Sequence, residues 1–341
     1  MVTTVPNADI AGNGALWIGL ETTYGTAVDP TASGVGVWMP IISETLAYNE
    51  AKYYSPQIRQ SATVSDVKQA YYHVEGDIVF EVDANYLPYL LYASRHTVTK
   101  TGTGPYVYAA VPTNVGSTYP GGSARGVSIL VERNSQGFLY NGCVVSNWEF
   151  TIDTGVLRCT ASMLGLAEND AAGAASPSWI DPELFGADAH SIYVDAAGTA
   201  PAFGGGRDNT FNGYTFRANH NGTPQNRIVP DRSATYISYG ETEVTYETEL
   251  DFVDKTEYDN MKLNTLRALK LESLRPGGLA TTFLTADEAV RITTYRSNYD
   301  SYAVGLSGMG DLIMANVTGR GIGIAGGVPY KIECKSPVNI T

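Results

Sequence analysis

The sequence has few residues of the types that carry metal or redox chemistry. Among 341 residues there are three cysteines and four histidines. The cysteines (Cys143, Cys159 and Cys334) show no CxxC spacing, and no two histidines have the three- or four-residue separation of metal ligands on a helix. We therefore expect reduced, packed thiols in a protein made in a reducing compartment, and neither a metal nor another cofactor.

Long apolar runs and an excess of positive charge are also lacking. No run approaches the roughly 18 apolar residues of a membrane span, and residues 1–6 have no feature of a secretory signal. The chain has 22 Lys and Arg against 35 Asp and Glu, a formal net charge of −13. This balance disfavours a nucleic-acid clamp, which needs cations to neutralise phosphates. It allows a surface that nucleic acid passes without adhering, because like charges repel.

The abundant residues are those of a turn-rich β protein. The 23 tyrosines favour strands, and 36 glycines and 16 prolines punctuate short runs. The apolar content of 43% and the length are sufficient for two domains with separate cores. We predict an all-β fold with short flanking helices, arranged as β domains at residues 1–168 and 183–341. The small, polar, proline-containing residues 169–182 are the expected linker.

An internal repeat is the strongest organisational signal. When the sequence is shifted by 172 positions, residues 61–86 show six identities, where chance gives about one or two. The identical pairs are Ser61 and Ser233, Ala62 and Ala234, Thr63 and Thr235, Glu75 and Glu247, Phe80 and Phe252, and Tyr86 and Tyr258. A repeat of this length indicates a duplicated domain and not a solenoid unit.

Both copies of the repeat contain a strand with one acidic face. Residues 72–83 and 240–252 alternate between apolar and mostly acidic side chains, the pattern of a half-buried strand. The acidic positions are Glu75, Asp77, Glu81, Glu241, Glu243, Glu247, Glu249 and Asp251. A solvated sheet face is the simplest interpretation. The alternative, favoured by the recurrence in both halves, is that these carboxylates line one aqueous pore.

The segments around these strands carry further predictions. Residues 49–66 show no clean periodicity and are expected to form a long connection, a kind of loop that is usually functional or disordered. We expect a strand at residues 211–219 and a short helix at residues 84–94. A longer helix is expected from a cap at Asp254 to about residue 274.

No motif in the sequence supports catalysis. Glycoside hydrolysis uses two carboxylates in unlike environments, whereas the acidic rows offer similar carboxylates in one environment. Residues 321–326 match the pattern GxGxxG, but the helix and second strand of a dinucleotide site are not expected after them. We therefore expect no enzyme, and a carbohydrate-active enzyme is the weakest alternative.

Three segments resemble the tail tube (major tail) proteins of long-tailed bacteriophages. They are residues 17–30, the strand at 74–83 with its following helix, and the strand at 237–252 with its helix. The resemblance covers most of the chain. It implies duplicated tail-tube β-sandwich domains that join between subunits into a barrel-forming ring. Such rings stack into the virion tail tube, which is the conduit for genome delivery and is made in the host bacterial cytoplasm.

The resemblance also implies partners. The first is the chain itself, as a ring of three two-domain chains, or of six chains if only one half forms the barrel. Tail terminator, tape-measure and tail-tip proteins are also expected, while double-stranded DNA passes without specific binding and no membrane is involved. Residues 49–66 are the candidate arm between stacked rings, or else an ordinary surface loop.

Two alternatives remain open at this stage. A tail-completion or baseplate-hub protein would share the same fold. A tail-tip or host-surface-binding β-sandwich module would present exposed aromatics on one set of loops; the candidates are Tyr48, Tyr53, Tyr54, Tyr71 and Tyr72.

Overall fold

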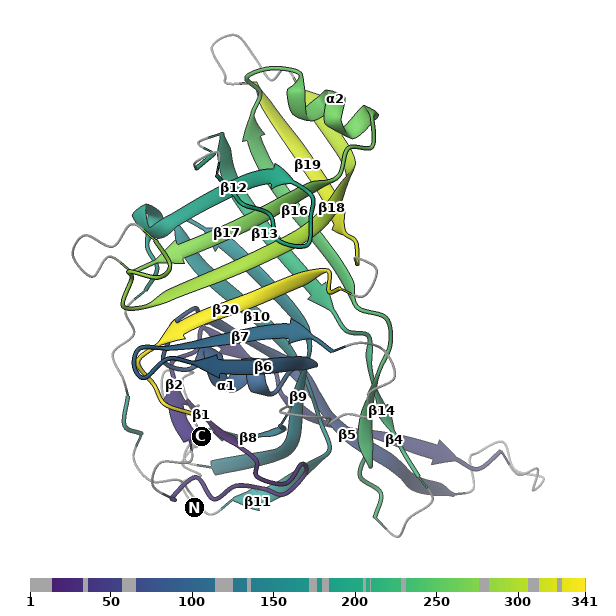
Figure 1. The fold of residues 1–341 in the computed structure, drawn as a ribbon. Coiled ribbons are helices and arrows are strands. Elements are labelled where there is room, and N and C mark those ends of the chain that lie inside the picture. Colours follow the sequence, from purple (N-terminus) through teal and green to yellow (C-terminus); the bar gives the residue numbers. More distant parts are fainter. Residues whose placement is uncertain are drawn as a thin grey trace, which may run out of the picture.

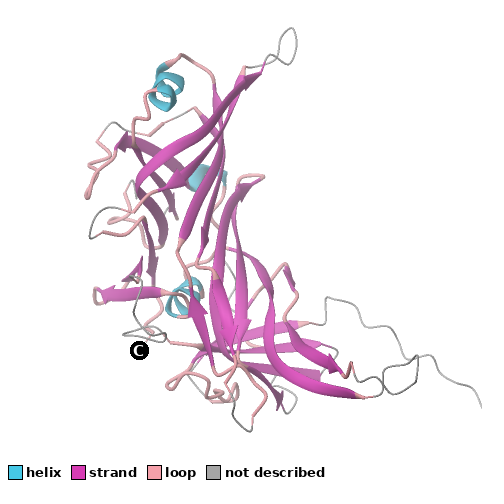
Figure 2. Cartoon of the chain, turned by 90° about the vertical axis from the view of Figure 1, so that its right-hand side faces the viewer, coloured by secondary structure: helices cyan, strands magenta, loops and turns pink. Residues whose placement is uncertain are grey.

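Strands dominate the part of the chain that the structure describes (Figures 1 and 2). The structure is a computed structural model. It describes residues 14–32, 36–56, 66–113, 125–133, 136–171, 177–179, 184–204, 207–208, 210–227, 231–275, 282–305, 313–323 and 327–340. Within these residues the α-helices are α1 (Leu87–Tyr92) and α2 (Thr256–Lys262), and η2 (Ala187–Ala189) is a 3₁₀ turn. The prediction of an all-β fold with short helices is confirmed.

Eight strands form one continuous antiparallel sheet, here called the eight-stranded sheet (Figure 1). Its order is β4 (Ala47–Tyr54), β5 (Val67–Glu81), β10 (Val156–Gly165), β9 (Gln136–Asp153), β13 (Phe211–Asn219), β16 (Glu243–Asp251), β19 (Met314–Gly321) and β18 (Ala289–Gly305). Each half of the chain contributes four strands. The halves join where β9 pairs with β13, with Glu149 opposite Arg217.

Two further sets of strands grow from the first parts of the long strands β9 and β18. The first set has the order β2 (Gly36–Met39), β1 (Ala15–Leu20), β8 (Val127–Arg133), β9 and β11 (Ala167–Ala171). The second has the order β12 (His190–Ala196), β17 (Arg267–Leu274), β18, β20 (Tyr330–Ser336), β7 (Tyr106–Pro112) and β6 (His96–Thr101). The remaining strands are β3 (Ser43–Glu44), beside β5, and the hairpin of β14 (Gly222–Gln225) and β15 (Tyr236–Tyr239).

The hydrophobic core lies between the eight-stranded sheet and these covering strands. Phe80 of β5 and Tyr246 of β16 are fully buried in the same cluster as Ile18 of β1 and Ile332 of β20. Because successive side chains of a strand point to opposite faces, the apolar positions of β5 and β16 enter this core and the polar positions stay outside. One face of the eight-stranded sheet is therefore covered, and the other is left uncovered within the chain.

The strand order is the same in the two halves. In the eight-stranded sheet the order β4, β5, β10, β9 is followed by β13, β16, β19, β18, and the covering strands run β1, β8, β9, β11 and β12, β17, β18, β20. A helix follows β5 and another follows β16. The hairpin β6–β7 belongs to the first half, and its strand β7 pairs with β20 of the second half.

Several element predictions can be compared with the structure. Residues 72–83 and 240–252 lie largely in β5 and β16, and the strand at residues 211–219 is confirmed as β13. Of the expected linker, residues 169–171 belong to β11, while residues 172–176 and 180–182 lie outside the described residues.

The predicted helix from Asp254 to about residue 274 is wrong in its second half. The helix α2 ends at Lys262, and Asn264 adopts a left-handed φ of 55°, which stops helical winding. Residues 267–274 form β17, which is buried between β12 and β18. Pairing on both edges outweighs the helical propensity of this segment.

The predicted connection at residues 49–66 is also partly wrong. Its first part belongs to β4, which pairs with β5 as far as Tyr54 opposite Val67. Residues 57–65 lie outside the described residues. Residues 49–54 are therefore part of one side of a long hairpin, formed by β4 and β5, that projects from the molecule and is here called the β4–β5 arm (Figure 1).

Candidate functional site

The uncovered face of the eight-stranded sheet, here called the polar face, is an organised polar surface that extends over strands of both halves of the chain. On β16, Glu243, Glu247 and Glu249 are exposed. The side chains of Val244 and Tyr246 between them are at most 1% exposed. On β5, the exposed Glu75 and Asp77 lie on either side of the partly buried Gly76 and are flanked by the fully buried Val74 and Ile78. The sequence-predicted alternation is thus present on both strands.

The strands between β5 and β16 continue the polar face with hydroxyl and amide side chains. Across the junction of the halves, Thr151 lies opposite Thr215, and Thr151 Oγ1 donates a hydrogen bond of 3.3 Å to Thr215 Oγ1. Two residue pairs further along the same face, beyond Glu149 and Arg217, Asn147 lies opposite Asn219. The face therefore crosses from one half to the other without an apolar interruption at this junction.

Arg217 ties three strands together on the polar face. Its Nε lies 2.9 Å from Glu149 Oε2 on β9, and its Nη1 lies 2.8 Å from Glu247 Oε1 on β16. The hydrogen bond to Glu149 raises the pKa of the guanidinium above its ordinary value. Because all three side chains are partly exposed, these ion pairs mainly fix the positions of the side chains and add only modestly to the stability of the fold.

A second arginine balances part of the acidic row on β16. Arg320 of β19 lies 3.4 Å from Glu243 and 3.7 Å from Asp300. Sequence reasoning noted the carboxylates but missed these arginines, because Arg217 and Arg320 are far from β16 in the sequence. Both arginines lie on strands that pair directly with β16, and this neighbourhood is visible only once the order of the strands in the sheet is known.

The other predicted acidic residues either accept hydrogen bonds from neighbouring side chains or are exposed to solvent. Glu75 accepts hydrogen bonds from Asn49 and lies 3.2 Å from His73 Nε2, and Asp251 accepts a bond of 2.6 Å from Asn212. The remaining positions are exposed or partly exposed: Asp77, Glu81, Glu241 and Glu249. The structure brings Glu75, Asp77 and Glu81 onto β5 and the other five onto or beside β16, which is four strands away in the sheet.

The carboxylates that the described residues place on the polar face are all exposed or partly exposed, whereas acid–base catalysis requires two carboxylates in unlike environments. Among the described residues, no group of three or more His, Cys, Asp or Glu side chains is arranged to hold a metal ion. No described helix has the length and apolar character needed to cross a membrane. The arrangement is a broad polar surface that spreads over both halves of the eight-stranded sheet.

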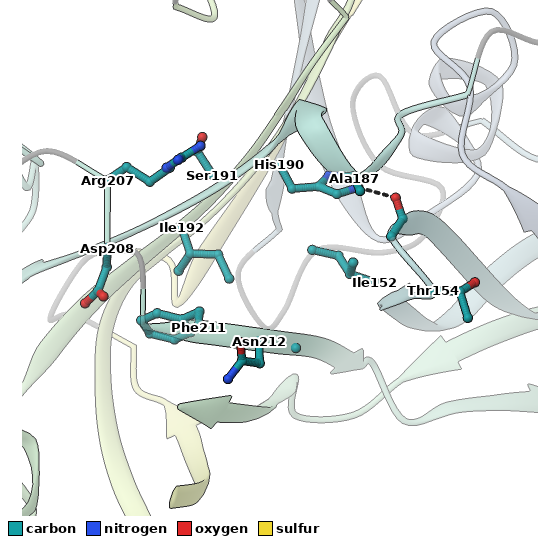
Figure 3. A pocket seen from close by; sticks show the side chains of 12 residues that line it. Ile152, Thr154, Ala187, His190, Ser191, Ile192, Arg207, Asp208, Phe211 and Asn212 are labelled. Atoms are coloured by element: carbon teal, nitrogen blue, oxygen red, sulfur yellow. Dashed lines mark hydrogen bonds between the residues drawn. The ribbon is translucent and has the colours of Figure 1, made fainter. Parts of the chain in front are cut away.

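A cavity of about 550 Å³ lies where the β9–β10 turn meets β12 and β13 (Figure 3). The imidazole of His190 faces it but is engaged on both sides, 2.9 Å from Ser273 Oγ and 3.2 Å from the carbonyl oxygen of Gly155. Burial lowers the pKa of this imidazole. Asp208 accepts hydrogen bonds from the backbone and side chain of Thr210. These lining groups are used structurally and give no paired nucleophile and base.

The β4–β5 arm carries exposed aromatic side chains. Tyr53 and Tyr54 are each 57% exposed. Tyr48 and Tyr71 are each 39% exposed. The rings of Tyr48 and Tyr72 have centroids 4.6 Å apart and are tilted by 33°, and the guanidinium of Arg232 lies 5.8 Å from the Tyr72 ring. The arm therefore has an anchored base, which contacts the second half, and an exposed outer part.

Comparison with known proteins places the whole arrangement in context. A family model described as phage tail tube protein matches residues 12–321. No curated protein matches the chain. The matched range includes both halves of the eight-stranded sheet, the polar face and the β4–β5 arm.

Proposed function

Because this chain belongs to the phage tail tube protein family, we propose that it self-assembles into stacked rings whose channel conducts the genome into the host. The family is one of structural components of the virion tail and not of enzymes. The ring, its subunit count and its role in genome delivery are the parts that we add to the family assignment.

The continuous polar face is the observation that carries this proposal. A sheet that closes into a barrel must turn one face inward, and the face opposite the hydrophobic core is the one that remains uncovered. Carboxylates there outnumber guanidinium groups. The acidic residues are Glu75, Asp77, Glu81, Glu149, Glu243, Glu247, Glu249 and Asp251, and the basic ones are Arg158, Arg217 and Arg320. Such a lining repels DNA phosphates and limits adhesion during passage.

The number of strands favours three chains in each ring. Three chains of eight strands give 24 strands. At about 4.8 Å between strands and a tilt of about 40°, they close a circle about 48 Å across between backbones. Inward side chains leave a channel of roughly 35–40 Å, which admits duplex DNA, about 20 Å in diameter. Two chains would give only about 32 Å between backbones and little free space, and six would give about 95 Å.

The matching strand order of the two halves supports the same number. If residues 1–168 and 183–341 are copies of one ancestral domain, each chain supplies two of six similar positions around the ring. The β9–β13 ladder would then be one of the six contacts between neighbouring positions. The expected tail terminator, tape-measure and tail-tip partners would bind at the ends or inside of such a tube.

Electron microscopy of the purified protein at high concentration, with mass determination of any ring, tests this proposal. Hollow tubes or stacked rings with the mass of three chains are expected. A ring of six chains would overturn the duplicated arrangement. A protein that stays monomeric even when an assembled tail end is supplied as initiator would overturn the tube function.

The exposed tyrosines favour one second candidate, a tail-tip module that binds the host surface. Tyr53 and Tyr54 offer the exposed aromatic surface that such binding uses. Replacing both with serine would then abolish adsorption of virions to cells and leave tube formation intact. If the residues instead contact the next ring, the same variant would shorten or abolish tubes.

A further inference from the structure

Two edges of the eight-stranded sheet have no neighbouring strand within the described part of the chain. β4 pairs only with β5, and residues 298–305 of β18 pair only with β19. Seven of the eight residues of β4 are exposed. A long exposed edge presents free backbone N–H and C=O groups and is a ready template for another strand.

We propose that the β18 edge of one copy pairs antiparallel with the β4 edge of the next copy, in the register by which β9 pairs with β13 inside one chain. This inference rests on the proposed function and specifies which strands and residues join the copies. The two edges lie at opposite sides of one sheet, so the contact is heterologous. Repeated contacts of this kind close into a ring of three chains when each copy is rotated by about 120° from the last.

The counterpart positions on β4 and β13 follow from the repeat. The 172-residue shift places Glu75 on Glu247. Thr215 of β13 lies opposite Glu247, and Ala47 of β4 lies opposite Glu75. Ala47 is therefore the counterpart of Thr215, and Ala51, four residues further along β4, is the counterpart of the fourth residue after Thr215.

The counterpart positions on β9 and β18 are found by following residues that lie opposite one another across neighbouring strands. The starting point in each half is a second pair of residues that the 172-residue shift makes equivalent. In the first half the row crosses β5, β10 and β9 through Asp77, Ser162 and Asn147. In the second half the row crosses β16, β19 and β18 through Glu249, Asn316 and Ala303. The shift places Asp77 on Glu249, so Ala303 is the counterpart of Asn147.

The contact within the chain then gives the register of the contact between chains. Asn147 lies opposite Asn219, which is the fourth residue after Thr215. Substituting the counterparts places Ala303 of one copy opposite Ala51 of the next. Both alanines are exposed in the single chain, so neither side chain has to leave a core for the pairing to form.

The two helices supply an independent observation for the same surface. Five of the six residues of α1 are buried, and α1 contacts β20 of the second half as well as β1, β6 and β7. In contrast, no residue of α2 is buried, and Leu263 and Val253 beside it are 76% and 73% exposed. Val304 and Ile313, at the end of the β18–β19 pair, are also exposed. The next copy would cover this apolar end of the second half.

Cysteine cross-linking of the full chain tests the register. Opposed residues of antiparallel strands have Cβ atoms about 4.5–5.5 Å apart, which a disulfide can span after a small adjustment. In the double variant Ala51→Cys and Ala303→Cys, oxidation of assembled tubes is expected to give closed covalent trimers on non-reducing denaturing gels. The three native cysteines do not compete, because they are buried and burial raises the pKa of each thiol.

A matched control uses Ala51→Cys with Val304→Cys, since successive residues of β18 point to opposite faces of the sheet. A second pair in the same register, Asn49→Cys with Gly305→Cys, guards against a local assembly defect; a Cβ at Gly305 meets no atom within 4 Å. Tubes in which neither matched pair cross-links, or the control links equally well, would overturn the register and leave the tube function standing. Absence of rings in the unmodified protein would overturn the function and this contact together.

Discussion

Tyr330 Oη and His96 Nε2 lie 2.7 Å apart in a hydrogen bond that joins β20 of the second half to the first residue of β6 in the first half. The same hydroxyl lies 3.3 Å from Nε2 of His220. Both imidazoles are fully buried, and their rings are 5.2 Å apart at the centroids. Two neutral histidines are thus held at the junction of the halves, where protonation would be costly.

The junction should make folding sensitive to acid. Burial, with a smaller contribution from His220, holds the pKa of His96 well below its ordinary value, and burial with the nearby Arg95 lowers the pKa of His220 to about 3. The unfolded chain binds these protons near pH 6.5, so the stability is fully present above pH 6.5 and is lost as pH falls toward 3. For His220 alone the loss is on the order of 5 kcal/mol. Urea unfolding of the single chain at a series of pH values measures it.

The matched variant for this prediction is His220→Gln, which keeps a polar side chain of similar reach but cannot titrate. It should be less stable at neutral pH and should show a shallower loss between pH 6.5 and 3. Equal slopes for the variant and the parent would show that other groups, and not this imidazole, control the acid response.

Phe80 should be among the most sensitive core positions. Its side chain is fully buried, and its ring packs against the edge of Tyr86 at a centroid distance of 5.8 Å. Phe80→Ala should lower the free energy of unfolding by about 3–5 kcal/mol, because it leaves a cavity between β5 and the covering strands. Leu284→Ala, at a side chain that is 79% exposed, is the control and should change stability by about 0.5 kcal/mol or less. Chemical denaturation distinguishes the two.

Gly76 should resist substitution for a backbone reason. It has φ of 154°, and a Cβ there would lie 2.4 Å from the carbonyl oxygen of Thr45. Gly76→Ala should therefore destabilise the chain by more than about 1 kcal/mol, although Glu75 and Asp77 on either side are exposed. At Gly198 a Cβ meets nothing within 4 Å, so Gly198→Ala should melt like the parent. Similar melting temperatures for both variants would contradict the assigned backbone geometry.

Charge reversal on the polar face should separate folding from genome delivery. Asp77→Lys with Glu249→Lys changes two exposed, equivalent positions, so the free energy of unfolding should change by about 0.5 kcal/mol or less per site. In the assembled tube the lysines would bind passing phosphates, and DNA ejection should slow, most strongly at low salt. The neutral variant Asp77→Asn with Glu249→Gln controls for loss of negative charge. Unchanged ejection by the lysine variant would remove these residues from the channel.

The sequence predicted those parts of the fold that depend on local alternation. β5 and β16 repeat apolar and polar residues with period two, and each lies largely where that period predicted a strand. The strand expected at residues 211–219 is β13. The acidic positions of the candidate site followed from the same pattern, because a half-buried strand exposes every second side chain.

The parts that sequence reasoning missed depend on contacts between distant residues. Residues 267–274 have helical propensity but form β17, which is buried between β12 and β18. The residues of this segment alone do not indicate that those two strands will lie beside it. The ion pairs of Arg217 link β13 to β9 and β16, whose order in the sheet is not encoded by periodicity. The same holds for the β9–β13 ladder, which makes the two halves share one sheet.

The hairpin β6–β7 has no counterpart among the described strands of the second half, yet the eight-stranded sheet repeats the same strand order twice in each chain. In a tube of three-chain rings, the bore would therefore repeat every 60° around the axis, while the outside would repeat only every 120°. DNA in the bore would meet a nearly uniform wall. A protein that recognises the outer surface would find three sites on each ring, not six, so any decoration of the tail should carry the lower symmetry.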